Sequence, residues 1–217
     1  MTGAAGLAVA ATAGLPALLA PAAAGRPATP PAATGRPASL PAAAAALGDP
    51  VVVREGRDAR AGGLDLTRVQ LGRSADGRLR AALTLAAGWT AATLVARSDP
   101  PNPPGSVCVR LWTVSATRGA PADFFVCLTA DRSGRRLRAG VLREGADGLL
   151  ERVAPAVVGR VSSRTVTLRF SQTAIGRPAR VRFAAEATRP GCVRTSCVDT
   201  APDAPATATL VLRRRAT

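Results

Sequence analysis

The stretch from Val107 to Val153 constrains the fold most, because short β-rich runs alternate there with turn residues. Its first two runs, 107–114 and 124–130, contain Cys108 and Cys127 respectively. A disulfide between these cysteines predicts an antiparallel pair with one wholly apolar face. On that face Val107 is opposite Leu128, Val109 is opposite Val126, and Leu111 is opposite Phe124.

The turn Asp131–Gly134 ends in a glycine that tolerates positive φ, which predicts a third strand after it. A four-residue loop at this turn continues the apolar face. It sets Leu137 opposite Leu128, Ala139 opposite Val126 and Val141 opposite Phe124.

The last turn of the stretch has two options. A two-residue turn at 147–148 would set Glu144 against Glu151, and like charges directly opposite one another are unfavourable. A three-residue loop at 146–148, with Gly148 left-handed, instead pairs Arg143 with Glu151 and Val141 with Val153. We favour the three-residue loop.

Alternation of apolar residues predicts further short strands along the chain. The hairpin 64–71/78–85 should pair Val69 with Leu83 around a three-residue loop. The segment 89–96 is interpreted as a strand or an irregular crossing, and Ser171 is expected to cap one helical turn at 171–176. The other expected strands lie near 51–53, 164–170, 179–187 and 207–213.

These elements predict an all-β domain of about nine or ten strands, without a long amphipathic helix. The expected architecture is an antiparallel two-sheet sandwich or jelly roll over residues 49–213, with a tail at 214–217.

The N-terminal part differs in composition. Residues 1–24 are apolar and uncharged and end in small residues, which predicts a signal peptide cleaved near Ala24, or alternatively an uncleaved membrane anchor. Residues 25–48 are rich in Ala and Pro and cannot bury a core, which predicts a disordered linker. The chain is therefore expected to be secreted or extracytoplasmic.

The four cysteines agree with export. We predict the disulfides Cys108–Cys127 and Cys192–Cys197, because exported domains form disulfides in an oxidising compartment. The alternative, a zinc site with four cysteine ligands, lacks finger-like spacing.

Three groups of residues carry a resemblance to known modules: Asp65–Val69, the hairpin Asp76–Leu79, and Thr188–Cys192 leading to Asp199–Asp203. Together they resemble exported actinobacterial β-sandwich modules, which are similar in layout to family-nine carbohydrate-binding domains and DOMON-like domains. The resemblance implies a sandwich that binds sugars or haem, or that supports other domains. The chain has no His to ligate haem.

Composition excludes most enzyme classes. The chain has no His and no Lys, so Ser-His-Asp, Cys-His and lysine-dependent chemistry are impossible. Only carboxylate chemistry remains, and the chain has few glutamates for it: Glu55, Glu144, Glu151 and Glu186. We therefore expect no catalytic residues and no enzyme.

The reverse face of the meander is the candidate binding face. It carries Trp112 and Phe125, surrounded by Arg110, Arg138 and Arg152. Aromatic rings with polar neighbours on a sheet face can stack sugar rings or dock a partner. The alternative interpretation is that the proline loop or Trp89 covers this face.

Several aspartates near the two ends of the domain predict a calcium site. The first and last strands of such sandwiches often pair, which would bring the acids together, and carboxylate oxygens suit Ca²⁺. Solvated loop acids are the alternative interpretation. The candidate ligands are Asp49, Asp58, Asp65, Asp199 and Asp203.

The net charge of +15 comes from 29 arginines against 14 acids. The arginines are distributed over every expected strand, so we expect no nucleic-acid stripe. The sequence thus predicts a monomeric, non-catalytic binding or structural domain associated with the cell envelope or with carbohydrate. It leaves the partner open, with a cell-wall glycan and an anionic polymer as the two candidates. The alternatives are a carboxylate-dependent hydrolase and adhesion to anionic wall polymers through arginine.

Overall fold

The structure is a computed structural model that describes residues 50–58, 64–96, 103–114, 121–145, 147–192 and 197–212. The predicted signal peptide (1–24), linker (25–48) and tail (214–217) lie outside the described residues, as does Asp49. Among the residues that are described, no helix has the length and apolar character needed to span a membrane.

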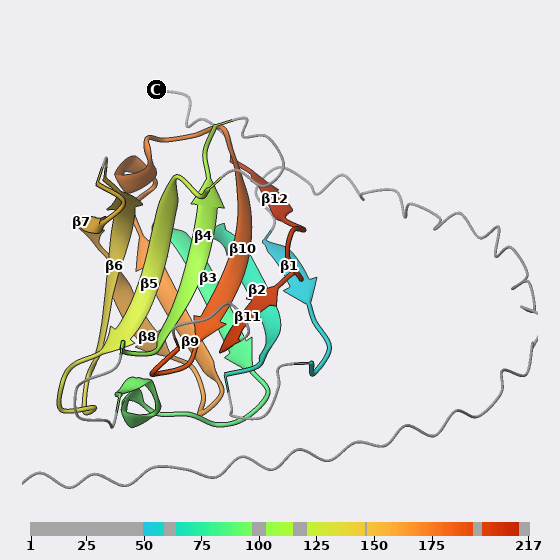
Figure 1. Ribbon diagram of the computed structural model, residues 1–217. Coiled ribbons are helices and arrows are strands. Elements are labelled where there is room, and N and C mark those ends of the chain that lie inside the picture. The colour runs from blue at the N-terminus through green and yellow to red at the C-terminus, as the bar shows by residue number, and fades with distance from the viewer. Residues whose placement is uncertain are drawn as a thin grey trace, which may run out of the picture. The chain divides into compact units, whose positions relative to one another are not determined.

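The described strands form two antiparallel sheets packed face to face, which confirms the predicted sandwich (Figure 1). The five-stranded sheet has the order β1 (Val51–Arg54), β2 (Leu66–Arg73), β3 (Leu79–Leu85), β9 (Thr165–Phe170), β8 (Val157–Arg160). The seven-stranded sheet has the order β11 (Val198–Ala201), β10 (Arg180–Thr188), β4 (Ser106–Trp112), β5 (Phe124–Ala130), β6 (Leu137–Glu144), β7 (Leu150–Pro155), with β12 (Ala208–Val211) also paired to β10.

The core lies between the sheets and is built by the alternation of apolar residues along each strand. Val69 and Leu83 from one sheet, and Val126 and Phe183 from the other, are fully buried. Each such side chain contributes roughly 1.5–3 kcal/mol of burial free energy. The inward positions predicted for β9, which are Val166, Leu168 and Phe170, are confirmed.

The meander β4–β7 has the predicted register at its first pair, where Cys108 is opposite Cys127. The register predicted for β5 and β6 is wrong by two residues, because Leu128 pairs with Ala139. Asp131 follows the last pair, Ala130 with Leu137, and its N–H donates to the Arg136 carbonyl at 2.9 Å. The Asp131 Oδ1 accepts hydrogen bonds from the backbone N–H groups of Arg135 and Arg136. A shift by two leaves the same side chains on the same face, so the apolar face survives.

At the third turn, Gly148 has φ +77° and Arg143 is opposite Glu151, as predicted. The predicted pairing of Val141 with Val153 is wrong, because a β-bulge sets Val141 opposite Ala154. Val153 is the extra residue and is 47% exposed.

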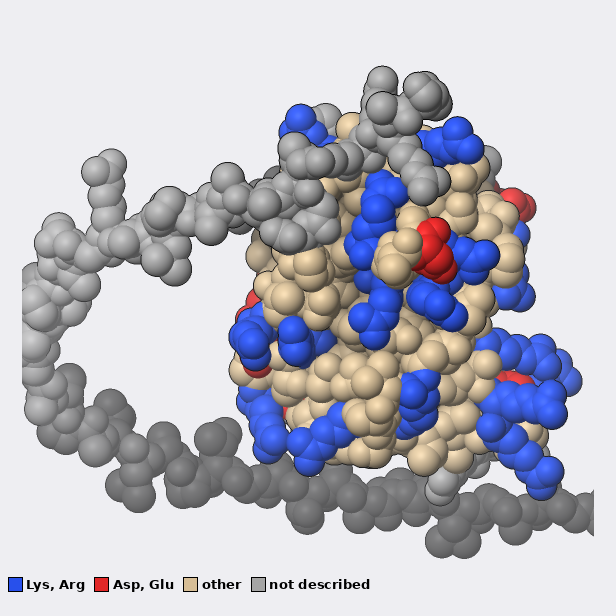
Figure 2. Space-filling model, turned by 180° about the vertical axis from the view of Figure 1, so that it is seen from behind, with Lys and Arg blue, Asp and Glu red and all other residues tan. Residues whose placement is uncertain are grey.

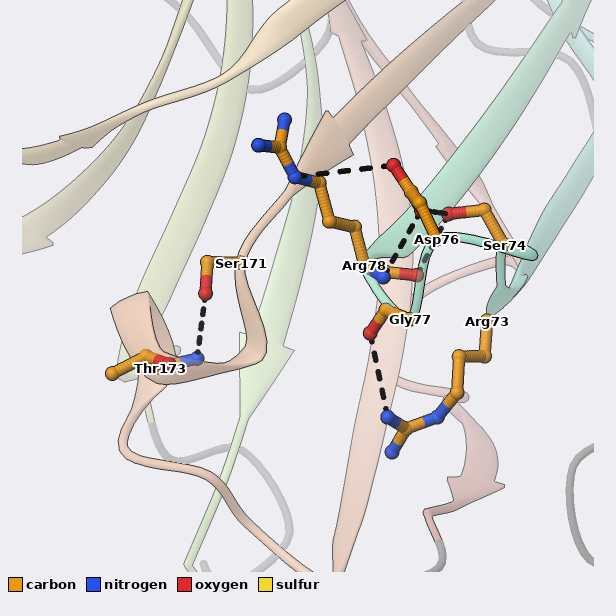
Figure 3. Close-up of polar contacts among 7 residues, drawn as sticks. All are labelled: Arg73, Ser74, Asp76, Gly77, Arg78, Ser171 and Thr173. Carbon is orange, nitrogen blue, oxygen red and sulfur yellow. Dashed lines mark hydrogen bonds and ion pairs between the residues drawn. The ribbon is translucent and has the colours of Figure 1, made fainter. Parts of the chain in front are cut away.

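The β2–β3 hairpin follows its prediction, including the pairing of Val69 with Leu83. Its turn is closed by Asp76, whose carboxylate accepts hydrogen bonds from the Ser74 hydroxyl (2.6 Å) and the Arg78 N–H (3.2 Å) (Figure 3). These hydrogen bonds lower the pKa of Asp76. Ser171 caps the short 3₁₀ helix η2 (Gln172–Ile175) by accepting a hydrogen bond from Thr173 N–H, as predicted.

Two predictions about element number need correction. The described residues contain twelve strands rather than nine or ten, because β8 follows β7 after one residue but joins the opposite sheet, and β11 was not expected. The segment 89–96, interpreted as a strand or an irregular crossing, contains the 3₁₀ helix η1 (Ala91–Leu94), so the strand alternative is wrong. Trp89 packs in the main core, so it cannot cover the reverse face of the meander.

Both predicted disulfides are present, Cys108–Cys127 and Cys192–Cys197. All four cysteines are therefore oxidised, and no thiolate is left to bind zinc. Two disulfides indicate an oxidising, extracytoplasmic compartment.

Candidate functional site

The predicted aromatic face lies on the outer side of the seven-stranded sheet. Trp112 is only 7% exposed there, because it packs with Ala122, Ala184 and Phe125. The Arg110 guanidinium lies 5.4 Å from the indole centroid. This face is therefore a small second core, and the indole does not form an open platform.

The charges around this second core are partly paired. Arg110 lies 3.5 Å from Glu186, and its guanidinium also contacts the Phe125 ring at 5.8 Å. Burial raises the pKa of Glu186, and the positive charge of Arg110 opposes this rise. Arg110 therefore has a packing role.

Arg152 and Arg138 have different surroundings. Arg152 donates a hydrogen bond to the Ala139 carbonyl at 2.5 Å and lies over Gly140, where an added Cβ would be 2.8 Å from its Nε. Gly140 is opposite Cys127, and Phe125 is opposite Leu142. Arg138 is exposed on β6.

The predicted acids do converge. Carboxylate oxygens of Asp58, Asp65 and Asp199 lie within 4.8 Å of one another, as do those of Asp58 with Glu55 and Asp203. Asp58 is common to both groups. The convergence arises because β1 pairs with β2 and because the Leu66 N–H at the start of β2 donates to Asp199 Oδ2 of β11 at 2.6 Å. Glu55 was missed, although it lies only three residues before Asp58.

We call Glu55, Asp58, Asp65, Asp199 and Asp203 the acidic cluster. Burial and the repulsion between carboxylates raise pKa values within it. Burial is the main cause that raises the pKa of Asp199 from 3.8 to about 6, and the charges of Asp58, Asp65 and Asp203 add to it. The hydrogen bond from Leu66 opposes the shift. Burial also raises the pKa values of Asp65 and Glu55.

The raised pKa of Asp199 predicts a pH dependence of folding. A carboxyl whose pKa is higher in the folded state holds its proton more tightly when folded. Its contribution to stability is therefore complete below pH about 4 and is lost as the pH rises through about 6. In the presence of a chelator, we expect the change in unfolding free energy between pH 4.5 and pH 7.5 to be smaller for Asp199→Asn than for the unmodified chain. Urea denaturation at both pH values measures this, and identical changes would contradict it.

The outer face of the five-stranded sheet is a third candidate. Every charged residue in its five strands is an arginine. Arg54 is directly opposite Arg68, and Arg80 is directly opposite Arg169. Val53 packs against the core beside Arg54, and Val69 is buried beside Arg68. Both strand neighbours of Arg80 and of Arg169 are also buried. Because side chains alternate along a strand, these four arginines, which we call the arginine face, project outward.

Figure 2 views this side of the molecule and shows arginines gathered among uncharged residues, with acidic side chains at few positions. From the sequence we expected arginines distributed over every strand and did not predict this gathering on one sheet face. Arg80 is opposite Gly72, which lies four residues after Arg68 on β2. The two arginine pairs are therefore displaced by roughly 13 Å along the strand direction.

Polar, uncharged side chains fill the space between the arginines. Thr84 is opposite both Arg68 and Thr165, and the two threonine hydroxyls are 3.0 Å apart. Arg68 donates to the Gln70 side chain at 3.2 Å. The face thus presents guanidinium groups together with uncharged hydrogen-bonding side chains.

The comparisons with known proteins supply no site residues for this chain. Comparison with protein-family models, with curated proteins and with solved structures finds no match, and the likeness to carbohydrate-binding and DOMON-like sandwiches stays a prediction.

Proposed function

We propose that this protein is a non-catalytic, exported binding domain that holds an anionic polymer of the cell envelope on the arginine face. The observation that carries the proposal is the pair of directly opposed arginines, Arg54 with Arg68 and Arg80 with Arg169. Of the alternatives, the geometry favours adhesion through arginine over an aromatic glycan platform.

Opposed like charges are costly unless something neutralises them. Each directly opposite like-charge pair destabilises a sheet by up to about 1 kcal/mol. Natural proteins accept such unfavourable pairs mainly at functional sites, and this face contains two of them. A bound polyanion would remove the repulsion, because guanidinium forks match phosphate and carboxylate groups bidentately.

The residue types on the arginine face also restrict the class of ligand. Phe170 is the only aromatic residue in the five described strands of this sheet, and it is 1% exposed in the core. Stacking of sugar rings or unpaired bases is therefore absent from the proposed recognition. The separation of the arginine pairs suits an extended polymer better than one small anion.

An extracytoplasmic location supports the proposal that the partner belongs to the cell envelope. Two disulfides are typical of extracytoplasmic proteins, and residues 1–24 have the pattern of a signal peptide with cleavage near Ala24, or of an anchor. An exported cationic domain meets anionic wall polymers at high local concentration.

The salt dependence of binding tests this proposal. We expect the full chain to bind poly(glycerol phosphate) with an affinity that falls about tenfold or more between 50 and 200 mM salt, because several anionic groups exchange their counterions for arginine. Polygalacturonate distinguishes carboxylate from phosphate recognition, and a neutral glucan should not bind. Absence of binding to both polyanions, salt-independent binding, or tighter binding to an oligonucleotide would contradict the proposal.

A further inference from the structure

In the acidic cluster, several carboxylates lie close together, and one buried carboxylate oxygen has no hydrogen-bond partner among the described residues. Asp65 is 9% exposed, and its Oδ1 is buried without a hydrogen-bond partner among the described residues. Its neighbour, the Leu66 N–H, donates to Asp199 instead. Buried polar atoms are almost always paired, so an unpaired carboxylate oxygen among other carboxylates points to a cation-binding site.

The spacing fits one ion. Ca²⁺ binds oxygen ligands at 2.3–2.6 Å, so two ligands of the same ion are at most about 5 Å apart. The oxygens of Asp58, Asp65 and Asp199 lie within 4.8 Å of one another. The donors are all hard carboxylate oxygens, and the chain contains no His, which disfavours zinc, copper and nickel.

We propose that Asp58, Asp65 and Asp199 bind one Ca²⁺. Glu55 and Asp203 lie beside this site, because their carboxylate oxygens are within 4.8 Å of a carboxylate oxygen of Asp58. The ion would join the two sheets, because Asp65 leads into β2 of the five-stranded sheet and Asp199 lies in β11 of the seven-stranded sheet. It would also satisfy Asp65 Oδ1 and offset the repulsion among the carboxylates. The cluster borders the arginine face, because Glu55 directly follows Arg54, but the test of the calcium site needs no polymer.

Thermal unfolding of the full chain tests the site. After treatment with a chelator, a free Ca²⁺ concentration a hundred times the Kd should raise the Tm by about 5–10 °C. Titration calorimetry with Ca²⁺ alone should show one binding event per chain.

Variants assign this effect to the cluster. Asp65→Asn should remove the calcium-dependent rise in Tm, and Asp58→Asn should weaken calcium binding at least tenfold. Asp58 is exposed, so its variant should fold even if that of Asp65 does not. Glu144→Gln removes one exposed acid outside the cluster and should keep the full response. No binding heat and no change in Tm, or an equal response in Asp58→Asn and Glu144→Gln, would overturn the proposal.

Discussion

Replacing Trp112 by Ala is expected to lower the free energy of unfolding by about 3 kcal/mol, near the lower end of the range for a buried Trp. The indole is 7% exposed and fills the second core with Ala122 and Ala184. The expected loss lies at the lower end because the second core is on the outer side of a sheet, where water can enter the space left behind.

Urea denaturation measures this loss, and an unchanged m value would show that the unfolded state is not altered. The matched control is Val114→Ala, two residues away and 67% exposed, which should change stability by at most about 0.5 kcal/mol. If Trp112→Ala left stability unchanged but abolished binding to wall glycans, the aromatic platform would be the better interpretation.

The second large effect concerns binding. Replacing both Arg80 and Arg169 by Thr should weaken binding of the polyanion at least tenfold, a difference of about 1.4 kcal/mol. Each guanidinium contributes charge-assisted hydrogen bonds, which are the stronger kind. Thr matches the uncharged residues already on this face, such as Thr84 and Thr167, and suits a strand.

The same double variant has a second readout. Because it removes a directly opposed like-charge pair, its unfolding free energy without polymer should stay equal or rise by up to about 1 kcal/mol. A variant that binds less tightly but is no less stable separates a functional face from a structural one.

Local turn chemistry explains which parts of the fold could be predicted. The β2–β3 hairpin follows from strand alternation and from Gly77, which has φ +78°. The β5–β6 register could not be predicted in the same way, because two loop choices preserve the apolar face and the Asp131 carboxylate selects between them. The switch of the chain between sheets after β7 has no local signal.

Features that depend on distant segments were predicted less well. The burial of Trp112 depends on β10, whose Ala184 packs against the indole and whose Arg182 lies 5.9 Å from the ring centroid. The convergence of Asp65 with Asp199 was expected, but the strand that delivers Asp199 is β11, which was not predicted. The arginine face could not be predicted, because it requires the strand order β1-β2-β3-β9.

The dissociation constant of the Arg80→Thr/Arg169→Thr variant for poly(glycerol phosphate) tests the central claim most directly. The control is Arg135→Thr/Arg136→Thr, which removes the same two charges from the exposed β5–β6 turn. The arginine face predicts a loss of affinity of at least tenfold for the first variant and about twofold or less for the control. Equal losses in the two variants would show that only net charge matters, and would contradict the assignment of binding to this face.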